Sequence, residues 1–129
     1  MGRAFSPGSG RAGAGQVTMK IRERNEGSVT VLDLKGPLAF GEGEEALRET
    51  ISRLVKEKKI SILVNFEKVE FMDSSGVGAL IKCLTSVTRA GGRLKGLRPT
   101  PLVQKILKIT GVFALFEFFE DEARAISSF

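Results

Sequence analysis

The sequence lacks histidine, tryptophan and tyrosine, and it has one cysteine, Cys83, among its 129 residues. Without histidine, the chain has no Ser-His-Asp triad, no Cys-His nucleophile pair and no histidine-based metal site. A single cysteine permits no disulfide within the chain, so nothing favours an oxidising compartment. Catalysis would have to rely on lysine or carboxylate chemistry.

Long apolar runs are also missing. No window approaches the roughly 18 consecutive apolar residues of a membrane span, and the opening MGRAFSPGSGRAGAG has no apolar region typical of a signal peptide. We therefore expect a cytoplasmic protein that does not bind a membrane. Residues 1–16 hold five glycines, three alanines and one proline without periodicity, which predicts a disordered tail ahead of one domain over residues 17–129.

The net charge of +5 is unevenly distributed along the chain. Arg3 and Arg11 fall in the predicted tail. Between Ser74 and Phe116 there is no acidic residue, which predicts a positive region on the folded surface. The basic residues in that interval are Lys82, Arg89, Arg93, Lys95, Arg98, Lys105 and Lys108. Because the nine phenylalanines lie mostly in apolar runs, no exposed stacking platform is evident, and we expect no nucleic-acid partner.

Hydrophobic periodicity predicts an α/β fold with the order β-β-α-β-α-β-α-β-α, which implies a mainly parallel sheet with an antiparallel edge hairpin. Alternating apolar residues favour hairpin strands at 17–23 and 29–34, and the run ISILVNF at 60–66 favours a central strand covered on both faces. Helical spacing, with acids in the first turn and lysines near the end, favours a helix over 44–57. The other expected elements are helices at 76–89, 102–110 and 120–129 and strands at 93–97 and 114–119. Residues 113–119 form either a buried strand or a partly exposed contact surface.

Residues 71–78, FMDSSGVG, follow the expected central strand and lead into a periodic apolar segment. Functional groups gather at such strand-to-helix junctions in α/β sheets. Three roles suit the two serines: a helix cap, a catalytic nucleophile or a regulatory phosphorylation site. In the first role, Asp73 or Ser74 is the N-cap, and Gly76 and Gly78 let the helix approach the sheet closely.

The nucleophile role fits the sequence poorly. A nucleophile elbow needs a glycine two residues before the serine, and Met72 and Asp73 occupy those positions here. The chain also has no G-x-x-x-x-G-K-[ST] phosphate-binding loop. The capping and regulatory roles remain.

The stretch FMDSSGVGALI resembles the signature of the STAS domain in bacterial anti-sigma factor antagonists. The similarity extends over roughly residues 17–126 and includes the hairpin, the G-x-L element at 36–38, FEKVEFMDSSG, AGGRL and the ITG at 109–111. The resemblance implies a single STAS domain: a mixed, mainly parallel sheet with an N-terminal antiparallel hairpin, packed against about four helices.

In that family the first serine after the aspartate is phosphorylated by the anti-sigma factor, which is itself a serine kinase. The resemblance places this site at Ser74 and gives Ser75 a structural role. It implies that the unphosphorylated chain binds the anti-sigma factor and frees the sigma factor, until phosphorylation releases it and a phosphatase restores it. Such a protein is not an enzyme, needs no cofactor or metal, and is a monomer or homodimer.

The resemblance also implies a partner-binding surface and one departure from the family. The surface comprises Asp73, Ser74, Ser75, Gly76, Val77, Gly78, Ala39, Phe40, Glu42 and Lys82. Ala39 stands where the family often has an aspartate near the phosphorylated serine, so Glu42 or Glu44 would have to substitute, or the chain binds its partner without efficient phosphorylation. Lys82 and Arg89 form a solvated face or, in a second reading, steer an acidic partner.

Two other functions stay open. One is a STAS scaffold subunit of a stress-signalling or transport-associated complex, which binds its partner constitutively. The other is a nucleic-acid binder that uses the positive surface, and its affinity would fall steeply with salt.

Overall fold

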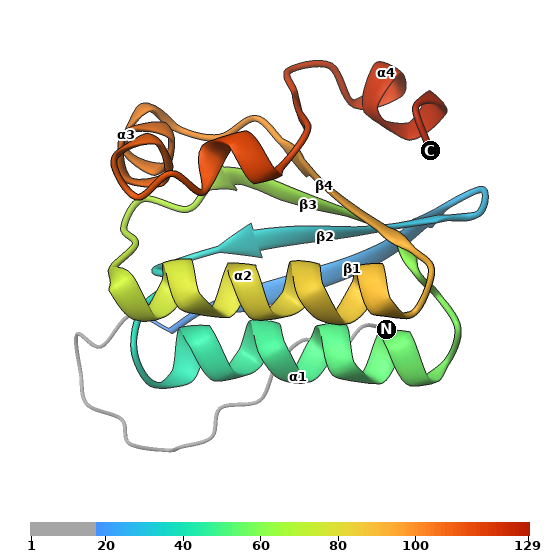
Figure 1. Ribbon diagram of the computed structural model, residues 1–129, viewed down its shortest axis with the longest axis horizontal. Coiled ribbons are helices and arrows are strands. Elements are labelled where there is room, and N and C mark those ends of the chain that lie inside the picture. The colour runs from blue at the N-terminus through green and yellow to red at the C-terminus, as the bar shows by residue number, and fades with distance from the viewer. Residues whose placement is uncertain (1–17) are drawn as a thin grey trace.

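The computed structural model describes residues 18–129, so the predicted tail and Val17 lie outside the described part of the chain. The elements follow the predicted order, with one additional 3-10 helix, η1 (Figure 1). The strands are β1 (Lys20–Glu26), β2 (Val29–Lys35), β3 (Ser61–Lys68), β4 (Arg93–Leu97) and β5 (Phe118–Phe119), and the helices are α1 (Glu42–Lys56), α2 (Ser74–Arg89), α3 (Pro101–Ile109), η1 (Phe113–Leu115) and α4 (Glu122–Ser127). No helix within residues 18–129 is long and apolar enough to cross a membrane.

The strands form one sheet in the order β1-β2-β3-β4-β5. β1 runs antiparallel to β2, and the other neighbours pair in parallel. The predicted α/β fold, its edge hairpin and the central place of β3 are therefore confirmed. The first strand extends past its predicted end at residue 23, because β1 pairs with β2 as far as Glu26 opposite Val29, and Gly27, at φ 66°, then reverses the chain.

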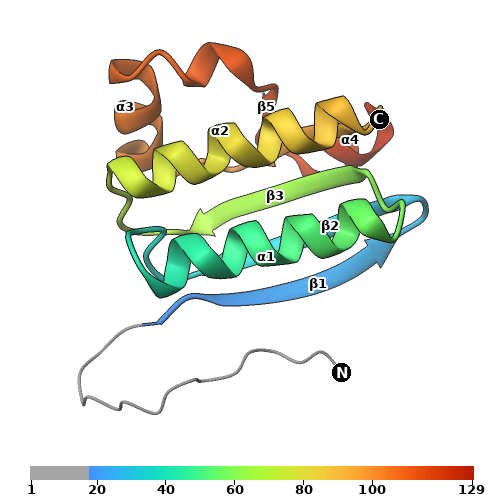
Figure 2. The same ribbon diagram turned by 60° about the horizontal axis from the view of Figure 1, so that its bottom comes forward.

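Helices cover both faces of this sheet. α1 and α2 lie side by side on one face, and α4 lies on the other (Figures 1 and 2). Successive residues of β3 alternate between them: Ile62 and Val64 belong to the larger core, and Leu63 to the core beneath α4. None of the three is more than 1% exposed, as expected for a central strand covered on both faces.

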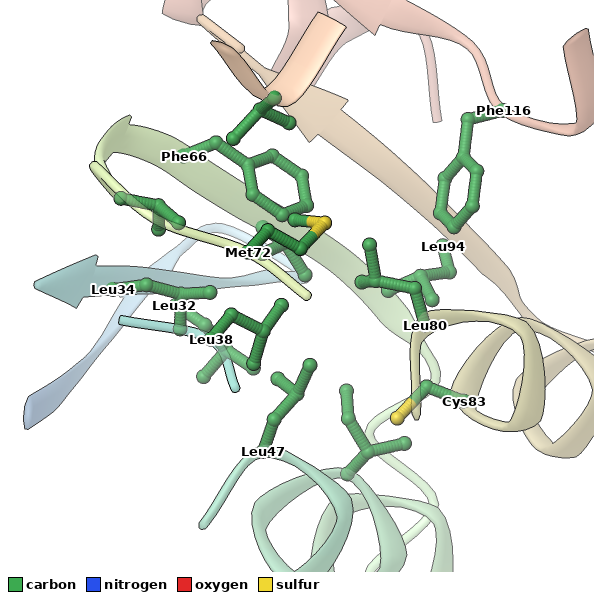
Figure 3. Close-up of a cluster of buried hydrophobic side chains, with 14 of the residues drawn as sticks. Leu32, Leu34, Leu38, Leu47, Phe66, Met72, Leu80, Cys83, Leu94 and Phe116 are labelled. Atoms are coloured by element: carbon green, nitrogen blue, oxygen red, sulfur yellow. The ribbon is translucent and has the colours of Figure 1, made fainter. Parts of the chain in front are cut away.

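The larger core includes side chains from loops as well as from regular elements. Figure 3 shows Leu38 and Met72, from the loops before α1 and α2, in the same interior as Leu47 of α1 and Leu80 of α2. Burying an apolar side chain of this size stabilises a fold by about 1.5–3 kcal/mol, so burial holds both loops in place. Cys83 shares this core, and burial raises the pKa of its thiol to about 12.

The predicted strand at 114–119 is wrong over most of its length, because only its end pairs with β4. Aromatic packing explains the difference: the Phe118 ring stacks on Phe113, with centroids 4.7 Å apart, and lies 5.6 Å from Phe116. Gly96 of β4 makes room for this cluster, since a Cβ there would lie 2.3 Å from the Phe118 ring. Phe113, Phe116 and Phe118 are therefore packed against the domain, whereas Ala114, Leu115 and Glu117 are exposed.

Lys95 does not belong to the predicted positive surface, because it is only 3% exposed. Its Nζ donates to the carbonyl oxygen of Ser128 at 2.8 Å and to the hydroxyl at 2.9 Å, and it lies 3.0 Å from the Glu117 carboxylate. The Phe129 ring centroid is 4.8 Å from the same nitrogen. A buried ammonium is tolerated when it is paired in this way, so Lys95 fastens the end of α4 to the sheet.

Arg24 fastens the other end of α4. Its guanidinium donates to Glu122 at 2.9 Å and to Asp33 at 2.7 Å. Partial burial alone would raise the pKa of Asp33, but hydrogen bonds from Arg24 and Asn65 outweigh it and lower that pKa. The hydrogen bonds from Arg24 likewise lower the pKa of Glu122. Both carboxylates therefore stabilise the fold while they are ionised.

We expect acid to remove this stabilisation. A depressed folded pKa contributes stability above the unfolded value, about 4 for these carboxyl groups, and the contribution is lost as the pH falls through the folded value. The free energy of unfolding should therefore fall more steeply between about pH 5 and pH 3 in the wild type than in Arg24→Met. Urea unfolding at a series of pH values measures this. Lys56→Met, an exposed change at the end of α1, should keep the wild-type slope, and an equally steep slope in Arg24→Met would contradict the assignment.

Candidate functional site

The loops before α1 and α2 are joined at the carboxyl edge of the sheet. The N–H of Gly36 donates to the carbonyl of Lys68 at 3.1 Å, and the N–H of Leu38 donates to that of Phe71 at 2.9 Å. Leu38 also forms an isolated parallel bridge with Met72. The pairing of β2 with β3 thus continues past the ends of both strands, and it brings the two loops against each other.

Asp73 completes this junction. One carboxylate oxygen accepts the N–H of Gly76 at 3.1 Å, which caps α2, and the other accepts the N–H of Phe40 at 3.1 Å. Of the two residues predicted as possible N-caps, Asp73 is the N-cap and Ser74 is not. Ser74 becomes the first residue of α2, with its side chain free of the capping role.

The two glycines of the motif differ in their surroundings. A Cβ on Gly76 would lie 2.1 Å from the carbonyl oxygen of Leu38, a distance that no side chain permits. A Cβ on Gly78 would have no described atom outside its own helix within 4 Å. Residues two apart on a helix point about 200° from each other, so the predicted packing role is confirmed for Gly76 and wrong for Gly78.

The other predicted residues of the motif differ in burial: some are accessible to a partner, and others are buried beneath them. Ser74 is exposed and Ser75 is half-buried, whereas Gly76 and Val77 are buried beneath them. Lys82 is exposed two turns further along α2. The side chain of Ser74 is therefore accessible to a partner that approaches the start of α2.

The loop before α1 supplies the neighbouring surface. The carbonyl of Ala39 accepts the N–H of Glu44 at 2.9 Å and so belongs to the start of α1. The Glu44 carboxylate forms an ion pair with Arg48, one turn along the helix. Glu42 is exposed in the first turn, and the side chain of Phe40 is 82% exposed.

Phe71 is a surface residue that the sequence reasoning missed. It is 52% exposed, although the next residue, Met72, is buried in the core. The carbonyl of Phe71 and the carboxylate of Asp73 accept hydrogen bonds from the loop that carries Phe40, so both exposed rings belong to the junction that presents Ser74. Its position in the sequence could have predicted this exposure. Phe71 lies past the end of β3, where the alternation of a strand no longer determines which side chains are buried.

Within residues 18–129, no group of three or more His, Cys, Asp or Glu side chains is arranged to hold a metal ion. The site instead consists of a hydroxyl, a capping carboxylate and two exposed rings. The family model of the STAS domain matches residues 19–125 of the sequence. The chain belongs to the STAS domain family. The predicted family and fold class are thereby confirmed.

Three comparisons define the similarity to individual STAS proteins. The chain is 20% identical to the anti-sigma F factor antagonist of Paenibacillus polymyxa over 111 residues, which is 86% of this chain and 95% of that protein. It is 26% identical to the anti-sigma factor antagonist SpoIIAA in its unphosphorylated form, with a TM-score of 0.66 over 84% of this chain and 96% of the other. For Bacillus SpoIIAA in the phosphorylated form the identity is 25% and the TM-score 0.66, over 84% and 99% of the two chains.

The contrast between the two glycines gives a matched pair of variants. Gly76→Ala should lower the free energy of unfolding by about 2 kcal/mol or more, because the new methyl group forces α2 away from the Leu38 carbonyl. Gly78→Ala should leave it unchanged or raise it by up to about 1 kcal/mol, since alanine is the better helix former. Urea unfolding followed by circular dichroism measures both, and equal effects would contradict the packing described above.

Proposed function

We propose that this chain is an anti-sigma factor antagonist whose binding is switched by phosphorylation of Ser74. It captures an anti-sigma factor that is also a serine kinase, and so frees a sigma factor. Phosphorylation of Ser74 by that kinase ends the capture until a phosphatase removes the phosphate. The observation that carries the proposal is the exposed Ser74 at the first position of α2, in a STAS domain whose relatives include antagonists.

The position of Ser74 suits a phosphate group. The first N–H groups of a helix have no partners within it, and the helix dipole favours a negative charge there by about 0.3–2 kcal/mol. Asp73 caps α2 independently of the Ser74 side chain, so the fold does not need that hydroxyl. The fold of this chain is similar to that of SpoIIAA in the unphosphorylated and in the phosphorylated form, with a TM-score of 0.66 to each, so this fold is compatible with a phosphate.

Phosphorylation would change the surface that a partner meets. Without phosphate, this surface combines the exposed rings of Phe40 and Phe71 with one small hydroxyl, a composition suited to burial against another protein. A phosphate adds about −1.5 to −2 charges beside the Asp73 carboxylate. A loss of affinity of ~100-fold corresponds to ~2.7 kcal/mol, and one desolvated charge without a partner costs that much or more.

Ala39 alters how the partner is recognised in this chain. It offers no carboxylate at the position where the family often has aspartate, and the Glu44 carboxylate is engaged by Arg48. Glu42 is exposed in the first turn of α1 and adjoins the loop that carries Phe40. We therefore assign the recognition role of the missing aspartate to Glu42 together with Phe40.

A phosphorylation assay tests the proposed function. Incubation with ATP and the anti-sigma factor kinase that the chain captures should place one phosphate on the wild-type chain, at Ser74. Ser74→Ala should abolish incorporation, whereas Ser75→Ala, the matched change at the neighbouring half-buried serine, should retain it. Peptide mass mapping measures the site. Phosphate on Ser75, or equal incorporation into Ser74→Ala, would overturn the assignment.

The same mixture of chain, kinase and ATP distinguishes the antagonist function from the scaffold function. A large assembly on sizing, in which a partner is bound constitutively and neither serine carries phosphate, would replace the antagonist by a scaffold subunit. A complex that dissociates on addition of ATP supports the antagonist.

A further inference from the structure

The exposed face of α2 continues from Ser74 along the whole helix. Gly78, Ile81, Thr85 and Arg89 follow Ser74 at steps of three or four residues, the spacing of one helical face. Ile81 is 38% exposed, and a side chain at Gly78 would meet no described atom beyond its own helix within 4 Å. The face therefore runs about 22 Å from Ser74 to Arg89, at 1.5 Å per residue.

The far end of this face is a groove between α2 and the end of α1, which lie side by side in Figure 2. It has a volume of about 550 Å³ and is open to solvent. Val55 of α1, Ile81 of α2 and Ala90, which caps the end of α2, supply its apolar lining. Lys82 and Arg89 supply its charges. Within residues 18–129, no acidic side chain lines it.

The surroundings of the groove extend its positive charge. α2 contains no acidic residue. Lys56 at the end of α1 and Lys58 in the following turn add two exposed positive side chains, and the carboxylate of Glu57 is paired with Arg53 and Lys59. An apolar floor with a rim of net positive charge fits a segment that is apolar on one side and acidic on the other.

We propose that this groove is a second docking site of the same partner, and that it receives an acidic amphipathic segment of the anti-sigma factor; this inference rests on the proposed function. Ser74 and the groove then have different roles in binding, at the two ends of one helix face. The groove attracts and orients the partner through charge, and the Ser74 end decides whether the complex persists. Gly78, which packing within the domain does not require, leaves its position on the face between the two contacts without a side chain.

Other occupants fit the groove less well. The first seventeen residues of this chain carry Arg3 and Arg11 and no acid, so their charge has the same sign as that of the groove. A second copy that docked groove to groove across a two-fold axis would bring Lys82 and Arg89 close to their own counterparts. The described lining holds no aromatic side chain on which a nucleic-acid base could stack.

The test measures association of the purified chain with the anti-sigma factor kinase at several salt concentrations. The double variant Lys82→Glu/Arg89→Glu should reduce the association rate constant about tenfold at low salt and flatten its salt dependence, because both contacts are charged. The matched control Lys105→Glu/Arg124→Glu makes the same charge change at exposed positions of α3 and α4, outside the groove, and should behave as the wild type. Urea unfolding establishes that both variants are folded.

The outcomes distinguish failure of the groove as a docking site from failure of the proposed function. If the wild type captures the kinase and both double variants associate at the wild-type rate, the groove is not a docking site and the antagonist function stands. If the wild type captures no anti-sigma factor, the proposed function fails and this inference fails with it. Competition by a short single-stranded oligonucleotide, lost in Lys82→Glu/Arg89→Glu but not in the control, would assign the groove to nucleic acid and overturn the proposal.

Discussion

The Asp73 carboxylate accepts two hydrogen bonds of 3.1 Å, one from the N–H of Gly76 and one from the N–H of Phe40. The first begins α2 and the second ties the loop before α1 to that beginning, so one side chain sets the separation of two helix starts. The contact of Gly76 with the Leu38 carbonyl requires this separation, because any side chain at Gly76 would occupy the same space. Leu38 and Met72 then anchor both loops in the core. Capping, loop pairing and core packing therefore depend on the same short junction.

This arrangement divides structural from regulatory roles. Gly76 and Val77 are buried and hold α2 against the sheet. Ser74 is exposed, and the helix is capped by Asp73 and not by the Ser74 hydroxyl. A charge can consequently be added at Ser74 while the residues that fix the helix stay in place. The same logic continues along α2, where the exposed face opposite the core, including Gly78, is available to another protein.

The pattern of apolar residues was sufficient to predict the order of the elements, the central position of β3 and the helix over 44–57, because each depends on a local pattern that burial against the sheet enforces. The burial of Lys95 was not predictable, since the groups that pair with its ammonium, in Glu117 and Ser128, are distant in the sequence. Nor was the shortening of β5, which depends on Phe118 filling the space above Gly96. The contrast between Gly76 and Gly78 follows from helix geometry once the start of α2 is known, but the sequence left that start open between two residues.

The central claim is that charge at Ser74 changes the binding surface and leaves the fold intact. The most direct measurement is the dissociation constant of the anti-sigma factor complex for Ser74→Asp and Ser74→Ala, with the free energy of unfolding of each variant measured alongside. The account predicts that Ser74→Asp weakens binding by about tenfold or more, which corresponds to about 1.4 kcal/mol, that Ser74→Ala binds as the wild type does, and that both variants keep wild-type stability. Wild-type affinity for Ser74→Asp, or weakened binding that accompanies loss of stability, would contradict it.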